Sequence, residues 1–172
     1  YGNAFKIADI DNDGYDDLLI GAPDSGPTGG FGYVYLYLGG SDVDNVPDKI
    51  FFGESNTYYF GNSITTGDFN NDSYTDILIG SRGMSDTVGE AYIFFGNDSI
   101  DTEPDVIFTA EGAGDYYATS VLSADFNNDD YDDALISAYG YSDDDGRAYI
   151  YYGGEQMGTT PNVTMDGAKT ED

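Results

Sequence analysis

The sequence predicts an all-β chain composed of three four-stranded β-propeller blades that form an incomplete ring. An acidic segment recurs at spacings of 59 and 57 residues, short aromatic runs keep the same period, and no stretch shows the periodicity of an amphipathic helix. Four short strands in a repeat of this length are typical of a propeller blade, and closed propellers contain about four to eight blades. We therefore expect further blades or other subunits to complete the ring.

The strands can be followed in order through the first repeat. Ala4–Ile10 leads into the acidic segment as the first strand, and Asp17–Ile20 leaves it as the second. Tyr33–Leu38 is predicted as the third strand, because tyrosines alternate with aliphatic residues at a period of two. After Pro47, the run Ile50–Phe52 supplies the fourth strand.

Independent landmarks support the same period. Successive prolines are 57 residues apart at Pro47, Pro104 and Pro161. Runs that begin and end in glycine recur at Gly32–Gly39, Gly89–Gly96 and Gly146–Gly153. The predicted blades span approximately residues 1–59, 60–116 and 117–172, and the last set of strands is expected to continue into the next copy.

Charge and composition exclude several functions. The 172 residues include 33 acidic and 5 basic ones, for a net charge of −28, so we expect neither nucleic acid as a partner nor insertion into a membrane. The 17 Tyr and 10 Phe residues provide a core and argue against disorder. Because the chain has no Cys and no His, it lacks disulfides, thiolate metal sites and the commonest general base.

The acidic segments have the pattern of calcium loops. Ca²⁺ takes about six to eight oxygen ligands from a loop that curls around it. Side chains at positions 1, 3, 5 and 9 and the carbonyl at position 7 are therefore the expected ligands, with one Ca²⁺ in each blade and three in all. The predicted ligands are Asp9, Asp11, Asp13, Tyr15 and Asp17; Asp68, Asn70, Asp72, Tyr74 and Asp76; and Asp125, Asn127, Asp129, Tyr131 and Asp133.

An EF-hand and a polar turn without metal are the two alternative interpretations of these loops. An EF-hand needs Glu at position 12 and flanking helices, but that position holds Ile20, Ile79 and Ile136. A polar turn without metal needs only two or three Asp, Asn or Gly residues, and does not account for three matched sets. The first site is predicted to be the tightest, because it has four carboxylates and a glycine, Gly14, at the sharp turn.

The chain resembles the FG-GAP repeats of integrin α-subunit β-propellers over essentially its whole length. The Phe-Gly element is matched by Phe60-Gly61, closely by Tyr1-Gly2 and more weakly by Tyr117-Ala118. The Gly-Ala-Pro element is matched by Gly21-Ala22-Pro23, whereas Gly80-Ser81-Arg82 and Ser137-Ala138-Tyr139 differ from it. The resemblance implies a propeller of usually about seven blades, stiffened by calcium and used to bind a ligand or partner.

These observations favour a calcium-stabilised extracellular or cell-surface module for structure or adhesion. Joining Asp172 to Tyr1 places the next acidic segment 56 residues after Asp125, which fits the repeat. Copies could therefore assemble head to tail into a ring or filament, or the chain could be part of a larger propeller, with a simple boundary between blades as the alternative. An extracellular location follows because such modules bind calcium at about 10⁻⁴–10⁻³ M.

The alternatives are glycan binding and catalysis. Tyrosine rings could stack on sugars as in a lectin, or pack between blades; they are Tyr33, Tyr35, Tyr37, Tyr149, Tyr151 and Tyr152. We do not expect an enzyme, because the clustered carboxylates are assigned to calcium. Asn97 and Asn162 are candidate glycosylation sites, whereas the third sequon, at Asn71, lies inside an acidic loop.

Overall fold

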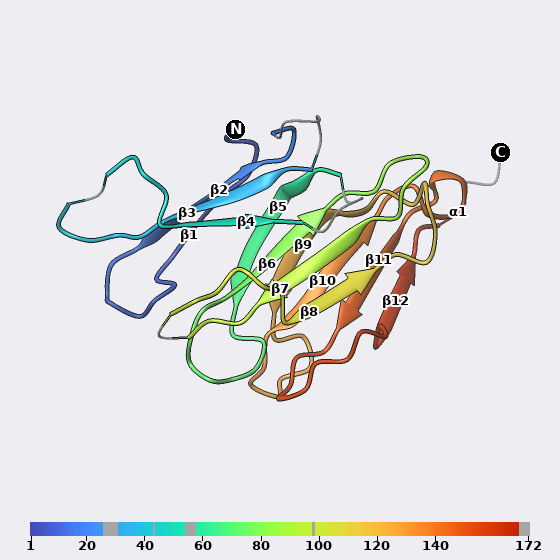
Figure 1. Cartoon of the computed structure of the whole chain (residues 1–172). Coiled ribbons are helices and arrows are strands. Elements are labelled where there is room, and N and C mark those ends of the chain that lie inside the picture. Colours follow the sequence, from blue (N-terminus) through green and yellow to red (C-terminus); the bar gives the residue numbers. More distant parts are fainter. Residues whose placement is uncertain (26–30, 43, 54–57, 98, 169–172) are drawn as a thin grey trace.

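The computed structural model describes residues 1–25, 31–42, 44–53, 58–97 and 99–168. Within these ranges the chain forms three four-stranded antiparallel sheets, which lie side by side and do not close into a ring (Figure 1). The predicted all-β fold of three propeller blades is confirmed. The termini of the predicted head-to-tail junction include residues 169–172, which lie outside the described residues.

Each sheet is a meander in which strands pair in chain order. The N-terminal sheet consists of β1 (Phe5–Ala8), β2 (Asp17–Ala22), β3 (Tyr33–Tyr37) and β4 (Lys49–Phe52). The middle sheet consists of β5 (Phe60–Gly67), β6 (Asp76–Ser81), β7 (Glu90–Phe94) and β8 (Val106–Thr109). The C-terminal sheet consists of β9 (Tyr117–Ala124), β10 (Asp133–Ala138), β11 (Arg147–Tyr151) and β12 (Val163–Asp166).

Two local features differ from the sequence prediction. The first strand ends at Ala8, because the backbone N–H of Ile10 donates to the Asp17 carboxylate instead of to a neighbouring strand. A four-residue helix, α1 (Tyr141–Asp144), interrupts the C-terminal repeat and is too short to show helical periodicity. Among the described residues, no helix has the length and apolar character required to cross a membrane.

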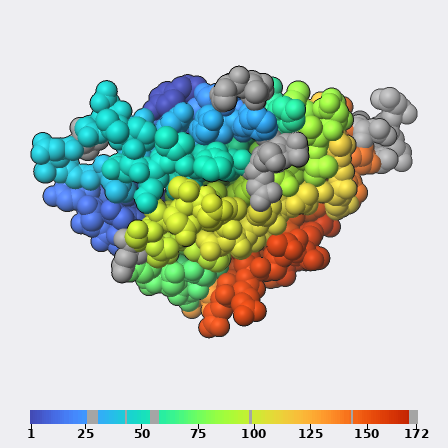
Figure 2. Space-filling view, viewed as in Figure 1, coloured from blue at the N-terminus to red at the C-terminus, as the bar shows by residue number. Residues whose placement is uncertain are grey.

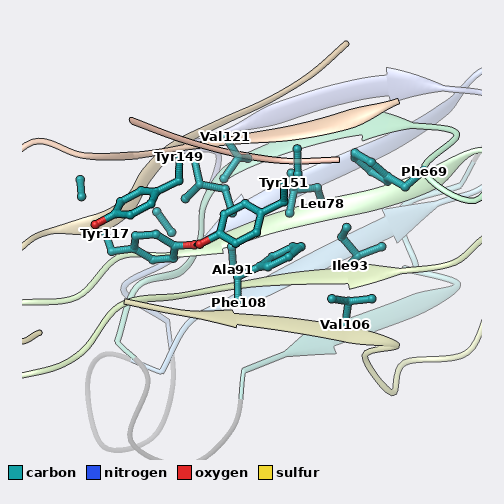
Figure 3. Close-up of a cluster of buried hydrophobic side chains, with 14 residues drawn as sticks. Phe69, Leu78, Ala91, Ile93, Val106, Phe108, Tyr117, Val121, Tyr149 and Tyr151 are labelled. Carbon is teal, nitrogen blue, oxygen red and sulfur yellow. The ribbon is translucent and has the colours of Figure 1, made fainter. Parts of the chain in front are cut away.

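The core consists of two apolar layers, one on each face of the middle sheet. Ile77 and Ile79 of β6 pack toward the N-terminal sheet, whereas Leu78 packs toward the C-terminal sheet. This division follows from the alternation of side chains along a strand. In the first layer, the rings of Phe51 and Phe94 meet edge to face with centroids 4.9 Å apart. Figure 3 shows the second layer, which includes Phe108, Tyr117, Tyr149 and Tyr151.

Glycine at the start of the Gly-Ala-Pro element allows neighbouring sheets to approach closely. A Cβ atom on Gly21 would lie 2.1 Å from the carbonyl oxygen of Gly61 in the next sheet. A Cβ on Gly80 would lie 2.5 Å from the carbonyl oxygen of Ala118. The C-terminal sheet has Ser137 at the corresponding position, and among the described residues no further sheet packs against it there. Glycine is therefore required at this position where the first strand of another sheet packs against it.

The outer faces of the two end sheets expose apolar side chains. On the N-terminal sheet, Phe5, Ile7 and Phe52 are 61%, 63% and 56% exposed. On the C-terminal sheet, Leu122 and Met165 are 55% and 46% exposed. Figure 2 shows the N-terminal sheet in blue and cyan at one side and the red C-terminal strands at the other, so the middle sheet is flanked on both faces.

Candidate metal centres

The three acidic loops connect the first and second strands of the three sheets. They span the nine positions of residues 9–17, 68–76 and 125–133, each ending on the first residue of the second strand, and they lie at the same end of the sheets, along the lower edge of Figure 1. Because β1, β5 and β9 run in the same direction through equivalent sheets, the loops leave the fold at equivalent places. The repeat thus brings the predicted ligands of each blade into one short turn.

The first carboxylate of each loop holds the turn together. The Asp9 oxygens accept the backbone N–H groups of Asp13 and Gly14 at 3.1 and 3.0 Å. Asp68 accepts the corresponding N–H groups, those of Asp72 and Ser73, at 3.1 and 3.0 Å. The same two hydrogen bonds in the third loop join Asp125 to Asp129 and Asp130 at 3.2 and 3.1 Å. The three loops therefore share one curled conformation, as their sequence pattern predicts.

Left-handed backbone conformations make this curl. Gly14 has φ of 90°, as expected from its place in the turn, but Ser73 and Asp130 adopt φ of 71° and 70° at the same position. Asparagines at position 4 of the loops also have positive φ: Asn12 (59°), Asn71 (55°) and Asn128 (62°). The ligand pattern does not single out these asparagines, although the enrichment of Asn in this region of φ could have indicated their role.

The last carboxylate of each loop is buried and joins three segments. Asp17 is 2% exposed, and its oxygens accept the backbone N–H groups of Ile10 at 2.7 Å and Gly39 at 2.6 Å. Asp76 and Asp133 are 0% exposed and make the same pair of bonds. The glycine donors end the three Gly-bounded runs, and the sequence analysis did not identify them as partners of these carboxylates.

Burial makes the charged form of two of these carboxylates, Asp76 and Asp17, unfavourable. It raises the pKa of Asp76 to about 7, a shift reduced by the N–H donors of Gly96 and Phe69 and increased by the charges of Asp72 and Asp68. The pKa of Asp17 is raised for the same reason. A nearby divalent cation would favour the charged form and offset this cost.

The first loop brings three predicted ligands together. One carboxylate oxygen from each of Asp9, Asp11 and Asp17 lies within 4.8 Å of the others, and no other described residues form such a group of acidic, His or Cys side chains. Asp13 lies outside this group, and its Oδ1 accepts the N–H of Tyr15 at 2.8 Å. Hard carboxylate oxygens in a curled loop suit Ca²⁺. The relative affinity of the sites and the carbonyl ligands of Tyr15, Tyr74 and Tyr131 remain predictions.

In the second and third loops, Asn replaces the carboxylate at position 3. The Asn70 amide donates to Asp72 at 2.9 Å, and the Asn127 amide donates to Asp129 at 2.8 Å. These bonds tie the two ligand positions together and leave one fewer negative charge for a cation. The first loop is therefore electrostatically the strongest candidate of the three.

The acidic loops also connect neighbouring sheets. The Asp68 N–H donates to the Asp132 carboxylate at 2.9 Å, and the Asp132 N–H donates to the Asp68 carbonyl at 2.9 Å. The Asn12 side chain donates to the carbonyl of Ser73 at 3.0 Å. A cation that orders one loop would therefore also order the junction with the next sheet.

The remaining predicted sites are surface or packing positions. Tyr149 and Tyr151 are 2% exposed in the second core layer, so their rings are inaccessible to a sugar. The middle residue of the Asn97 sequon, Asp98, lies outside the described residues. Asn162 is exposed, but its side-chain oxygen accepts the N–H of Tyr152 at 2.8 Å, which gives it a structural role. Glycosylation of Asn97 and Asn162 remains a prediction.

Comparison with known proteins identifies the repeat. The FG-GAP repeat family model matches residues 1–37, 60–94 and 117–151, which together cover more than half of the chain. These three segments contain β1–β3, β5–β7 and β9–β11 with their acidic loops. The match therefore includes the loops that carry the candidate metal ligands.

Individual relatives are much longer than this chain. Integrin alpha-5 of Xenopus laevis is 30% identical in an alignment of 154 positions that covers 81% of this chain and 15% of that protein. Integrin alpha-8 of Gallus gallus is 31% identical in an alignment of 166 positions that covers 88% of this chain and 15% of that protein. Phosphatidylinositol-glycan-specific phospholipase D of Bos taurus is 26% identical in an alignment of 186 positions, gaps included, that covers 97% of this chain and 22% of that protein.

Proposed function

The chain belongs to the FG-GAP repeat family, and on that premise we propose that it is an extracellular, calcium-stabilised module for structure or adhesion. The proposal is carried by the three curled loops of matched oxygen donors, each connected by hydrogen bonds to a neighbouring sheet. One Ca²⁺ in each loop would stiffen the end of its blade and the junction with the next blade. Binding of a partner, and not catalysis, is the proposed activity.

Calcium would act mainly by offsetting repulsion between carboxylates. Asp9, Asp11 and Asp17 converge in a chain whose net charge is −28, and burial already disfavours the charged form of Asp17. Modules of this type work at about 10⁻⁴–10⁻³ M calcium, which is an extracellular concentration range. The named integrin relatives support a role in adhesion for the longer protein to which such blades belong.

Calcium titration tests this proposal. Isothermal titration calorimetry on the full chain should detect about three sites for Ca²⁺ and much weaker binding of Mg²⁺, which requires a stricter geometry. Chelation should lower the melting temperature, because an ion that binds the folded chain and not the unfolded chain stabilises the fold. If calcium binding released or absorbed no heat and chelator left the melting temperature unchanged, the calcium-dependent role would be excluded.

We also propose that the end sheets pair with further blades, either of a larger propeller or of copies of this chain. Phe5 and Ile7 share the exposed face of their sheet with Ile20, because the register pairs Phe5 with Ile20. On the equivalent face of the middle sheet, Ile79 is fully buried against a neighbour and its strand partner Ile64 is partly buried. A partner sheet would bury the exposed face in the same way.

Ser137 provides a specific test of pairing between copies. At the equivalent positions of the other sheets, a Cβ would meet the backbone of the following sheet, so Ser137 should hinder an identical junction. Sedimentation velocity should therefore show stronger concentration-dependent association for Ser137→Gly than for the wild-type chain, with Ser99→Gly, an exposed position of the middle repeat outside both end sheets, as the control. Equal and purely monomeric behaviour of all three chains would restrict the proposal to blades of a larger propeller.

Carbohydrate binding is the alternative function, but it is weakened by the burial of Tyr149 and Tyr151. Tyr33, Tyr35 and Tyr37 remain half-buried on the outer face of the N-terminal sheet, where a partner blade would also bind. A glycan array probed in calcium distinguishes the two functions. Saturable binding to one glycan class that is lost in Tyr35→Ala would favour the lectin-like alternative.

A further inference from the structure

A polar cleft lies at the opposite end of the sheets from the acidic loops. Its volume is about 280 Å³, and Asn3, Asn62 and Thr119 contribute to its lining. Each of these residues directly follows the Phe-Gly element of its repeat or the variant of that element. The cleft therefore forms where the first strands of the three sheets, β1, β5 and β9, begin. It shares no residue with the candidate calcium loops.

Arg82 is the distinctive residue of this cleft. It occupies the third position of the Gly-Ala-Pro element, where the first repeat has Pro23. Unlike proline, Arg82 has a backbone N–H, which donates to the Asn62 side-chain oxygen at 2.9 Å. Its guanidinium group lies over the ring of Tyr59, 4.5 Å from the centroid. These contacts hold a long cationic side chain in a defined position.

The guanidinium group of Arg82 has unused hydrogen-bonding capacity. Its Nε is buried and has no hydrogen-bond partner, and no carboxylate among the described residues forms an ion pair with it. Buried donors are nearly always paired, so the unpaired Nε sets Arg82 apart from the other polar side chains of the cleft. Because Nε itself is out of reach of solvent, an acceptor in the cleft would engage the terminal Nη groups. The contrast with Arg147, which forms ion pairs with Glu111 and Asp166, is marked in a chain with 33 acidic residues.

The neighbouring amide donors are already engaged. The Asn62 amide donates to the carbonyls of Ala118 and Thr119 at 3.1 and 2.8 Å. The Asn3 amide donates to the Asn62 carbonyl at 3.1 Å. Arg82 thus supplies the available N–H donors of the cleft, and its planar fork matches the two oxygens of a carboxylate.

We propose that this cleft binds a carboxylate group, with Arg82 as the residue that recognises it. A singly charged, planar group suits the site better than a tetrahedral dianion, because Asp24 lines the same cleft and the chain is strongly acidic. The volume is just below the range of about 300–1,000 Å³ for larger ligands, which suits a small acid or one acidic side chain. This inference goes beyond the proposed function and does not depend on calcium binding.

Nuclear magnetic resonance can test the site on the full wild-type chain in calcium. The probes are acetate, a neutral-capped tripeptide with a central glutamate, and sulfate as the tetrahedral dianion. The Arg82 Nε–H resonance should shift in a saturable manner with acetate or with the peptide, and much less with sulfate. Tighter binding of acetate indicates a free small acid as the ligand, whereas tighter binding of the peptide indicates an acidic side chain of a protein.

Two variants and a control complete the experiment. Arg82→Gln should weaken carboxylate binding about tenfold or more, whereas Arg82→Lys should lose less because it keeps the charge but not the fork. Lys49→Gln removes the same charge from a strand outside the cleft and should leave the affinity unchanged. The proposal is overturned if the wild-type resonance does not saturate with either carboxylate, if sulfate binds more tightly, or if Arg82→Gln binds like the wild type.

Discussion

Replacing Asp17 by Asn separates the two roles that the last carboxylate of an acidic loop is expected to have. Without metal, Asp17 accepts the N–H groups of Ile10 and Gly39, and it is 2% exposed. The Asn amide retains one acceptor oxygen but places an NH₂ group against the second N–H. Leaving that buried donor unpaired costs about 1–3 kcal/mol, and relief of repulsion from Asp9 and Asp11 offsets a part of it.

Calcium should increase the difference in stability between the wild-type chain and Asp17→Asn. At a concentration of about 100 times Kd, a bound ion stabilises the wild-type chain by about 2.7 kcal/mol, and the variant should lose most of this contribution. For a domain of this size, 1 kcal/mol corresponds to about 2–4 °C in Tm. Calcium should therefore raise the Tm of the wild-type chain by roughly 5–10 °C more than that of Asp17→Asn, through the first site alone.

Thermal unfolding in chelator and in calcium measures both effects, and Asp16→Asn is the matched control. Asp16 is the adjacent residue, it is exposed, and its substitution changes the net charge by the same amount. Equal calcium stabilisation of Asp17→Asn and the wild-type chain would show that Asp17 is not a ligand. Equal stability of the two chains in chelator would refute the role of its hydrogen bonds in holding the loop.

Three further predictions concern the second acidic loop and the junctions between sheets. Because burial raises the pKa of Asp76 from 3.8 to about 7, the folded chain binds this proton more tightly than the unfolded chain does. In chelator, the contribution of Asp76 to the free energy of unfolding should therefore fall as pH rises from about 4 to 7. Calcium needs the deprotonated carboxylate, so the calcium affinity of the second loop, measured by calorimetry, should fall up to about tenfold per pH unit below 7. Phe94→Ala should lower stability by about 3–5 kcal/mol in urea unfolding, and a double-mutant cycle with Phe51→Ala should give about 0.5–1.5 kcal/mol of coupling. Arg147→Gln should lower the Tm only slightly, because the two carboxylates that it pairs with are largely exposed, although its guanidinium group also lies 3.8 Å from the centroid of the Tyr141 ring.

The repeated parts of the fold could be predicted from the sequence because each signal occurs three times. Alternation in Tyr33–Leu38 correctly places the tyrosines and the aliphatic residues on opposite faces of β3. The structure adds which face is the inner one, because Val34 and Leu36 are fully buried. The acidic segments correctly predict curled loops, because oxygen-bearing residues at alternate positions accept N–H groups within the turn. Local patterns of this kind are independent of contacts with distant parts of the chain.

Features that depend on a neighbouring sheet could not be predicted in this way. Arg82 differs from the repeat pattern, but the sequence does not show that its Nε is buried or that Tyr59 lies beneath its guanidinium group. Likewise, the exchange of Gly for Ser137 has a meaning only when the close approach at Gly21 and Gly80 is known. Packing between sheets, and not local propensity, determines the role of such residues.

The arrangement of charge and apolar surface indicates why this chain would need calcium. The chain has no disulfides, so adjacent sheets are held by apolar layers such as the contact of Phe51 with Phe94 and by hydrogen bonds between their loops. The loop bonds join segments rich in carboxylates, of which those of the first loop converge, and repulsion between these groups opposes the contacts that the apolar layers favour. A divalent ion in each loop would reduce the repulsion between carboxylates at the loop end of the sheets. The Arg82 cleft lies at the other end, so ligand binding there would not depend on the ions. Stiffening of the blades and recognition of a carboxylate would then be separable properties of one repeat.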